Sequence, residues 1–207
     1  MFHVKQAADR PMLAALNVSR ETELRLEAYV DLLQSWSQRI NLISRHDLNT
    51  IWPRHVMDSL QLAPLVRPDI SHAIDLGSGA GFPGLILAIV TNIRFHLVES
   101  DQRKSAFLRE ASRITAAPAT VHPVRIEALE IAPAPLITAR ALAPLNRLLP
   151  LAARLLAENG ECLFLKGAQA DAELDEVRQD WHMELHRHES CTSPDATILQ
   201  ICDLRHV

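Results

Sequence analysis

Several residue types are scarce in this 207-residue chain, and each scarcity narrows what the chain can be. It has three cysteines, Cys162, Cys191 and Cys202, an odd number without short metal-ligand spacing, which favours a reducing compartment. No stretch approaches the roughly 20 apolar residues of a membrane span, and the N-terminus has no apolar signal region. We therefore expect a cytoplasmic protein without a membrane segment.

Lysine is also rare, because 18 of the 21 basic residues are arginine. The net charge of −4 is unevenly distributed: residues 171–207 hold nine acidic and three basic residues. The other 16 acidic and 18 basic residues give residues 1–170 a net charge of +2. Arginine suits phosphate forks and base stacking, so the charge permits RNA binding. A codon-composition bias toward arginine explains the same excess equally well.

The hydrophobic pattern divides the chain at about residue 70. Ser19 can cap a helix whose first turn holds Glu21 and Glu23, and a second helical stretch spans 48–66. From residue 71 strands alternate with helices, which indicates a parallel, doubly wound α/β sheet. We therefore expect an N-terminal helical extension (1–70) and an α/β domain (71–207). The expected strands are 71–76, 94–99, 120–124, 136–140, 161–166, 183–189 and 197–203, and the expected helices are 83–91, 102–115, 145–157 and 168–180.

Glycine is scarce too, yet four of the six glycines fall within eight positions, at 77, 79, 81 and 84. They lie between a predicted strand and a predicted helix. Glycine costs backbone entropy, so its use here indicates positive φ or close backbone approach. Four glycines exceed what a bare turn needs, and they predict a ligand pressed against the backbone, although a tight but empty turn is the alternative.

The frame of the glycines distinguishes two cofactor classes. From Gly79 the segment satisfies G-x-G-x-x-G, the dinucleotide fingerprint, but two residues past the strand end at Gly77. From Asp75 it reads D-x-G-x-G-x-G, which resembles the first motif of S-adenosylmethionine-dependent methyltransferases. An acid there suits a cofactor with a sulfonium and an amino group, and we predict cofactor contacts at Asp75, Gly77, Gly79 and Gly81. Glu99 ends the next strand, where either cofactor class uses a carboxylate for ribose hydroxyls.

The chain after the fourth predicted strand bears on the methyl acceptor. It contains neither a Pro-Pro-aromatic turn for an exocyclic amine nor a Pro-Cys nucleophile for pyrimidine C5 chemistry. The remaining candidate is Arg140, a cation at the mouth of the expected site. It suits an acceptor such as guanine N7, which supplies its own lone pair and needs no general base. Catalysis would then rest mainly on alignment and exclusion of water.

Five separated motifs carry a family resemblance: 41–44 (Asn-Leu-Ile-Ser), 54–59 (Arg-His-Val-Met-Asp-Ser), the glycine loop, 139–141 (Ala-Arg-Ala) and 165–167 (Leu-Lys-Gly). In order and spacing, over about residues 20–207, the chain resembles the bacterial small-subunit ribosomal RNA methyltransferase G family, also called glucose-inhibited division protein B. The resemblance implies a Rossmann-like, seven-stranded class I methyltransferase fold with a mostly parallel sheet. It also implies N7 methylation of one guanosine in 16S ribosomal RNA of the small ribosomal subunit.

The resemblance further implies specific site residues. S-adenosyl-L-methionine would contact Gly77, Phe82, Ile126, Glu127 and Arg140. Arg54, His55 and Lys166 would face the RNA. On this interpretation the protein acts as a monomer, holds no metal and has no membrane partner.

Several alternatives stay open at this point. The chain could be an NAD(P)-dependent oxidoreductase, or a non-catalytic ribosome-binding factor that keeps a cofactor pocket. Asp58 follows Arg54 by four residues and can orient it, or the segment can serve only to dock a helix. The histidines at 182, 186 and 188 indicate the polar face of a strand rather than a zinc site. The acidic segment 171–180 is interpreted as a solvated helix face.

Overall fold

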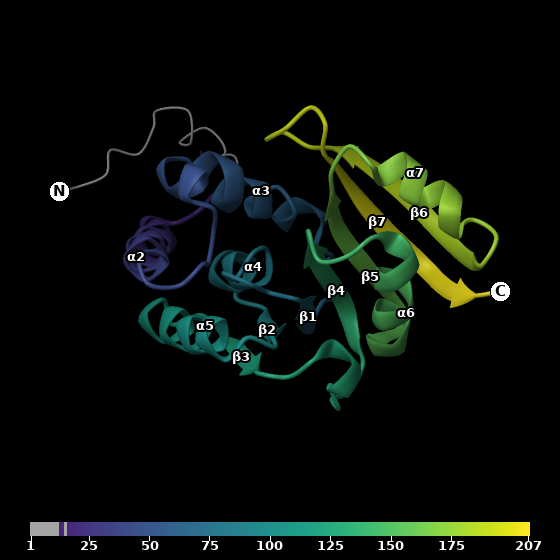
Figure 1. Cartoon of the computed structure of the whole chain (residues 1–207), viewed down its shortest axis with the longest axis horizontal. Coiled ribbons are helices and arrows are strands. Elements are labelled where there is room, and N and C mark those ends of the chain that lie inside the picture. Colours follow the sequence, from purple (N-terminus) through teal and green to yellow (C-terminus); the bar gives the residue numbers. More distant parts are fainter. Residues whose placement is uncertain (1–12, 15) are drawn as a thin grey trace.

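One sheet of seven strands organises the α/β part of the chain, in the order β3-β2-β1-β4-β5-β7-β6 (Figure 1). The computed structural model describes residues 13, 14 and 16–207. β1 to β5 are parallel, whereas β7 pairs antiparallel with both β5 and β6. The predicted, mostly parallel seven-stranded sheet is therefore confirmed. The strands are β1 (His72–Leu76), β2 (Arg94–Val98), β3 (Ala119–His122), β4 (Ala134–Arg140), β5 (Leu156–Lys166), β6 (Trp181–Glu189) and β7 (Thr197–His206).

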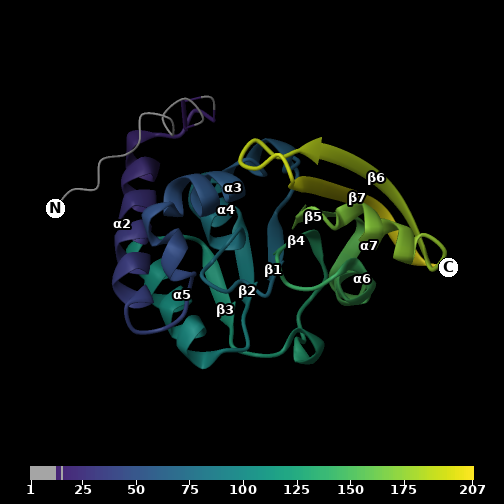
Figure 2. The same cartoon turned by 45° about the horizontal axis from the view of Figure 1, so that its top comes forward.

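Helices cover both faces of this sheet (Figures 1 and 2). α4 and α5 lie on one face, with α2 packed outside them, and α6 and α7 lie on the other face. The inner helix α4 is buried over Leu85–Ile89, as expected for a helix between a sheet and a third layer. The helix bounds are α2 (Arg20–Ser37), α4 (Gly84–Thr91), α5 (Gln102–Ile114), α6 (Leu145–Leu155) and α7 (Ala170–Val177).

The N-terminal helix α2 shares its core with the α/β part. Leu26, Tyr29 and Leu33 of α2 are fully buried. The centre of the Tyr29 ring lies 6.1 Å from the centre of the Phe107 ring on α5. Ser19 caps α2 as predicted, because its side-chain oxygen accepts the backbone N–H of Thr22 at 3.1 Å. Segments 13–70 and 71–207 therefore form one packed unit.

The helical stretch predicted over 48–66 is present in part, because residues 51–60 form one continuous helical segment that is irregular in pitch and is flanked by two 3-10 turns. The 3-10 turn η1 (Arg45–Asn49) comes first, the π-helical η2 (Trp52–Val56) continues directly into α3 (Met57–Leu60), and the 3-10 turn η3 (Ala63–Leu65) follows. Pro53 lies in the first turn of this segment, where a missing N–H is tolerated, and Pro64 lies in the first turn of η3, so each proline stands at the start of a helical element. The segment places Asp58 against Arg140 at the end of β4.

The helix expected to end at Asn159-Gly160 ends earlier. α6 stops at Leu155 and β5 begins at once with Leu156, so Asn159 (φ +58°) lies inside the strand segment rather than at a helix cap. The pairing of β4 with β5 shifts register between Ala134 and Leu136, which accommodates the bend. Pairing with β4 thus overrides the local cap signal.

The polar face predicted for β6 is confirmed. His182 hydrogen-bonds Asp203, His186 hydrogen-bonds Glu184, and the half-buried His188 hydrogen-bonds Gln200. Within residues 13, 14 and 16–207, no group of three or more histidine, cysteine or acidic side chains is arranged to hold a metal ion. None of the helices in that part of the chain is both long and apolar enough to cross a membrane.

Candidate functional site

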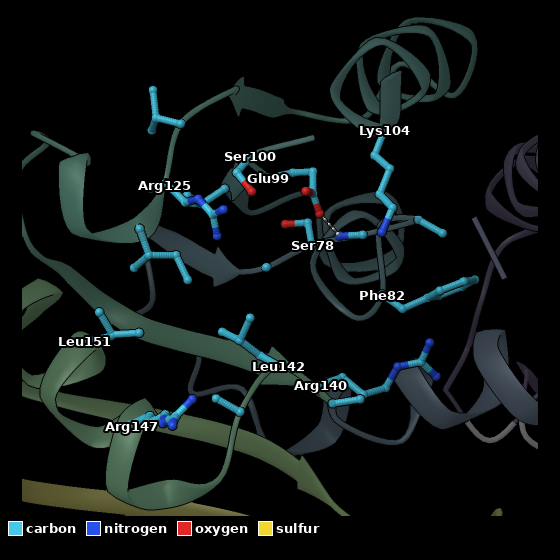
Figure 3. A pocket seen from close by; sticks show the side chains of 18 of the residues that line it. Ser78, Phe82, Glu99, Ser100, Lys104, Arg125, Arg140, Leu142, Arg147 and Leu151 are labelled. Carbon is cyan, nitrogen blue, oxygen red and sulfur yellow. Dashed lines mark hydrogen bonds between the residues drawn. The ribbon is translucent and has the colours of Figure 1, made fainter. Parts of the chain in front are cut away.

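A cavity of about 820 Å³ opens at the carboxyl ends of β1, β2 and β4 (Figure 3). β1 lies between β2 and β4, so the strand order reverses there, and open α/β sheets bind ligands at such a point. The volume lies within the usual range for small-molecule sites. Seven of the nine residues predicted to contact the cofactor line the cavity, namely Gly77, Gly79, Phe82, Glu99, Ile126, Glu127 and Arg140.

The glycine loop between β1 and α4 forms one wall of this cavity. Gly77 has φ +66° and Gly79 has φ +56°, both in the region that disfavours side chains. A Cβ atom on Gly77 would also lie 2.5 Å from Cδ1 of Leu142, which is a clash. Gly81 also has positive φ but does not line the cavity, since it packs against Leu85 and Leu108. The loop therefore presents bare backbone to a ligand at Gly77 and Gly79.

Glu99 lies at the end of β2 with 9% of its surface exposed. Its Oε2 accepts the backbone N–H of Gly79 at 2.9 Å and its Oε1 accepts that of Asp101 at 2.8 Å. A carboxylate oxygen has two lone pairs, so each oxygen keeps one for a ligand. This arrangement fixes the glycine loop to β2 and leaves a bidentate acceptor that matches two neighbouring hydroxyl groups.

Asp75 does not face the cavity, which corrects the prediction that it contacts the cofactor. It is fully buried beneath the glycine loop, where Oδ1 accepts Thr138 Oγ1 at 2.6 Å and Oδ2 has no hydrogen-bond partner. A Cβ atom on Gly84 would lie 2.4 Å from Cβ of Asp75, so the chain passes directly over it. Burial raises the pKa of Asp75 to about 6, against hydrogen bonds that lower it. Asp75 therefore supports the loop from below.

The turn η4 (Ile126–Ala128) supplies the far wall of the cavity. Ile126 is half-buried there and Glu127 is exposed. The guanidinium of Arg154 on α6 donates to the backbone carbonyls of Ile126 and Leu129, the latter at 3.1 Å. This turn is thus held rigidly to α6, at the position where the family resemblance implies adenine contacts.

Arg140 lies between the first cavity and a second one. The second cavity, of about 920 Å³, shares His55, Arg140 and residues 141–143 with the first, so the two adjoin. Nη1 of Arg140 donates to Oδ2 of Asp58 at 3.2 Å, and the guanidinium carbon lies 4.7 Å from the ring centre of Phe82. Arg140 is therefore held on two sides at the junction.

His55 also lines both cavities, but its ring nitrogens are not available to a ligand. Both are buried without a hydrogen-bond partner, and the ring stacks on Phe82 with 5.0 Å between ring centres. Burial, followed by the positive charge of Arg140, lowers the pKa of His55 to about 4. His55 is therefore a neutral part of the wall near neutral pH, and the predicted RNA contact is limited to its edge.

The lowered pKa of His55 predicts a pH effect on stability. The folded protein binds this proton less readily than the unfolded chain, whose histidine titrates near the ordinary 6.5, so stability falls as the pH drops from 6.5 toward 4. His55→Phe keeps a ring on Phe82 but has no group that titrates. We therefore expect its free energy of unfolding to fall by roughly 1–2 kcal/mol less than that of the natural chain over this pH range. Urea unfolding at pH 7 and 4.5 measures the difference, and equal losses would contradict it.

The two other residues predicted to face RNA line the second cavity. Arg54 is exposed and pairs with Asp47 at 3.5 Å, not with Asp58 as its spacing suggested. Lys166 is largely buried and donates to the Ala143 carbonyl at 3.0 Å while pairing with Glu173. Lys166 is therefore committed to shaping the wall, whereas Arg54 keeps most of its surface free.

Some hydrogen bonds that hold the site together are not indicated by the local sequence. Asp58 accepts hydrogen bonds from Arg140, Thr192 and Gln61, which joins the loop after β6 to the junction. The Tyr29 hydroxyl on α2 donates to the Ala80 carbonyl at 2.6 Å and so holds the glycine loop from the N-terminal side. Only the tertiary structure brings these residues together.

The acidic helix α7 is more than a solvated face. Besides pairing with Lys166, Glu173 accepts the backbone N–H of Leu145 at 2.8 Å, and Glu176 accepts the Asn146 amide at 3.3 Å. Both carboxylates thus face the N-terminus of α6, the end that favours negative charge. They fix the segment that separates the two cavities.

Several known proteins are similar to this chain in sequence. Residues 22–202 match the family model for rRNA small subunit methyltransferase G. The chain is 52% identical to the ribosomal RNA small subunit methyltransferase G of Granulibacter bethesdensis over the full length of both, and 56% identical to that of Gluconobacter oxydans, covering 92% of this chain and 98% of the relative.

Solved structures resemble it in fold. One is the N-methyltransferase NodS from Bradyrhizobium japonicum in complex with S-adenosyl-L-homocysteine (TM-score 0.58, 13% identity, covering 82% of this chain and 96% of that one). Another is a Thermus thermophilus 16S rRNA N2 G1207 methyltransferase in complex with AdoMet and guanosine (TM-score 0.52, 16% identity, covering 70% and 38%). The predicted fold class is confirmed, and by its family match and close relatives the chain belongs to the rRNA small subunit methyltransferase G family.

Proposed function

We propose that this methyltransferase of small-subunit ribosomal RNA transfers a methyl group from S-adenosyl-L-methionine to N7 of one guanosine in 16S RNA. The observation that carries the proposal is the position of Arg140 at the junction of two adjoining cavities. The first cavity fits the methyl donor and the second leaves room for a nucleotide. An RNA methyltransferase needs two adjoining cavities of this kind, because the methyl donor and the acceptor nucleotide bind separately and must meet at one point.

The residues of the first cavity fit S-adenosyl-L-methionine. The paired oxygens of Glu99 suit the two ribose hydroxyls, and the bare backbone at Gly77 and Gly79 allows close approach. Ile126 and Glu127 would border the adenine, and Phe82 would lie near the junction. When bound, the cofactor supplies an electrophilic methyl group.

The chemistry at the junction favours an acceptor with its own lone pair. Asp58 is bonded to Arg140 and Thr192, Glu173 is paired with Lys166, and His55 has both ring nitrogens buried. The possible general bases that line the second cavity are thus engaged or enclosed. Guanine N7 carries no proton to lose, so the protein needs only to orient the base, exclude water and keep Arg140 facing it.

The same reasoning extends to the partner and the setting. We propose that Arg54 contacts the RNA, that the protein acts as a monomer in the cytoplasm, and that its partner is the small ribosomal subunit. Only two large hydrophobic residues of the described chain are strongly exposed, Leu24 and Val207, so no large apolar patch invites self-association. The family match does not favour the oxidoreductase or the non-catalytic factor considered above.

Labelled methyl transfer tests the proposal directly. The protein is incubated with labelled S-adenosyl-L-methionine and either naked 16S RNA or small subunits from cells lacking the enzyme, and the modified nucleoside is identified. We expect 7-methylguanosine at a single position. Methylation of another atom would overturn the N7 assignment, and no transfer to either substrate would favour a binding factor.

A further inference from the structure

Three basic side chains around the donor cavity have no side-chain partner among the residues that the structure describes. Lys104 lies on α5, Arg125 precedes η4 and Arg147 lies on α6, and all three line the cavity. Within residues 13, 14 and 16–207, none of them makes an ion pair or a side-chain hydrogen bond. Figure 3 shows Arg125 and Arg147 on the side of the cavity away from Phe82, with Lys104 extending from its helix. We call these three residues the basic rim.

The charge of the basic rim does not suit the methyl donor. Together with Arg140 the rim gives the cavity four cations against two carboxylates, Glu99 and Glu127. S-adenosyl-L-methionine itself has a net charge of +1, from a sulfonium, an ammonium and a carboxylate. The donor has only one carboxylate to pair with these cations, so the cations left over repel its sulfonium and ammonium groups and weaken donor binding. Their presence indicates a second, negatively charged ligand at the same opening.

We infer that the basic rim binds RNA phosphates and thereby couples RNA binding to binding of the methyl donor. This inference rests on the proposed function, since it places RNA over the donor cavity. Phosphates that neutralise the rim remove the repulsion, so RNA raises the affinity for the cationic donor, and the donor raises the affinity for RNA by the same factor. The demethylated product, S-adenosyl-L-homocysteine, has lost the sulfonium charge. RNA therefore raises its affinity for the protein less than it raises that of the donor. Transfer of the methyl group thus weakens the hold on RNA and helps release it.

The first test is the variant Arg147→Gln, for which the rim predicts opposite effects on the two ligands. Affinity for S-adenosyl-L-methionine without RNA should rise about two- to fivefold, because a like charge is removed. Affinity for unmethylated small subunits should fall, and the slope of its logarithm against log salt should decrease by about 0.7–1. Calorimetry and filter binding measure the two quantities. Loss of fold cannot produce a gain for one ligand and a loss for the other.

The matched control is Arg109→Gln. Arg109 is an exposed arginine on α5 without a side-chain partner among the described residues, and it lies outside both cavities. The exchange removes the same charge from the same protein, so neither affinity should change. Equal effects in both variants, or no effect of Arg147→Gln on either ligand, would overturn the basic rim.

The second test concerns the coupling. Sinefungin cannot donate a methyl group but carries an ammonium where the donor has its sulfonium, so it is compared with S-adenosyl-L-homocysteine in the presence and absence of small subunits. RNA should raise the affinity for sinefungin several-fold more than that for S-adenosyl-L-homocysteine. Equal increases would disprove the coupling. Because neither test requires methyl transfer, both remain valid even if the modified atom is not guanine N7.

Discussion

Methyl transfer should fall by at least about 100-fold when Arg140 is replaced with alanine, while the protein stays folded. Arg140 lies at the junction of the two cavities, where its guanidinium contacts Asp58 and lies over Phe82. Removing it takes away the charge that faces the acceptor and the side chain that separates the cavities. Initial rates with saturating donor, together with the melting temperature, measure the two parts of this expectation.

Two further variants make the Arg140 result interpretable. Arg140→Lys keeps a positive charge but loses the planar fork, so a partial loss would show that geometry matters in addition to charge. Arg178→Ala removes an exposed arginine that follows α7 and lies outside both cavities, and it should leave the rate unchanged. If Arg140→Ala keeps its turnover to within about threefold, Arg140 does not belong to the reacting centre.

Donor affinity should fall by about 10- to 100-fold in Glu99→Gln. The Glu99 carboxylate accepts the backbone N–H groups of Gly79 and Asp101, one on each oxygen. A glutamine amide has only one acceptor oxygen, so its NH₂ group must face one of these N–H groups. The variant therefore loosens the glycine loop and also loses the charged acceptor for a ribose hydroxyl. Equilibrium binding of S-adenosyl-L-methionine by calorimetry measures the loss.

Glu158→Gln is the matched control for Glu99. Glu158 is exposed, lies outside both cavities, and the same change there should alter donor affinity by less than twofold. An affinity of Glu99→Gln within twofold of the natural chain would remove Glu99 from the donor site. A large drop in melting temperature would instead assign it to holding the loop.

Much of the donor site was predictable because its signals are local in the chain. A glycine that must adopt positive φ and admit a ligand is visible in the sequence itself, and Gly77 and Gly79 do both. Parallel strands end at one edge of a sheet, so Glu99 and Arg140 were expected at the same opening once their strands were identified. The alternation of strands and helices along the chain is a local signal too, and it was sufficient to predict the mostly parallel sheet.

Asp75 and Lys166 have contacts that such reasoning did not give. Residues at strand ends and in nearby loops can point into the cavity or beneath it, and the sequence does not distinguish these directions. Asp75 lies underneath the loop, against Thr138, and Lys166 is held by Glu173 from a helix later in the chain.

The sequence by itself determined the fold class, the frame of the glycine loop and the family, because these depend on periodicity, on glycine stereochemistry and on ordered motifs. The tertiary structure alone decided that Asp58 pairs with Arg140 rather than Arg54, and that Tyr29 holds the glycine loop. It also decided which arginines remain unpaired around the cavity. Ion pairs and hydrogen bonds join atoms that are far apart in the chain, so they follow from packing and not from spacing.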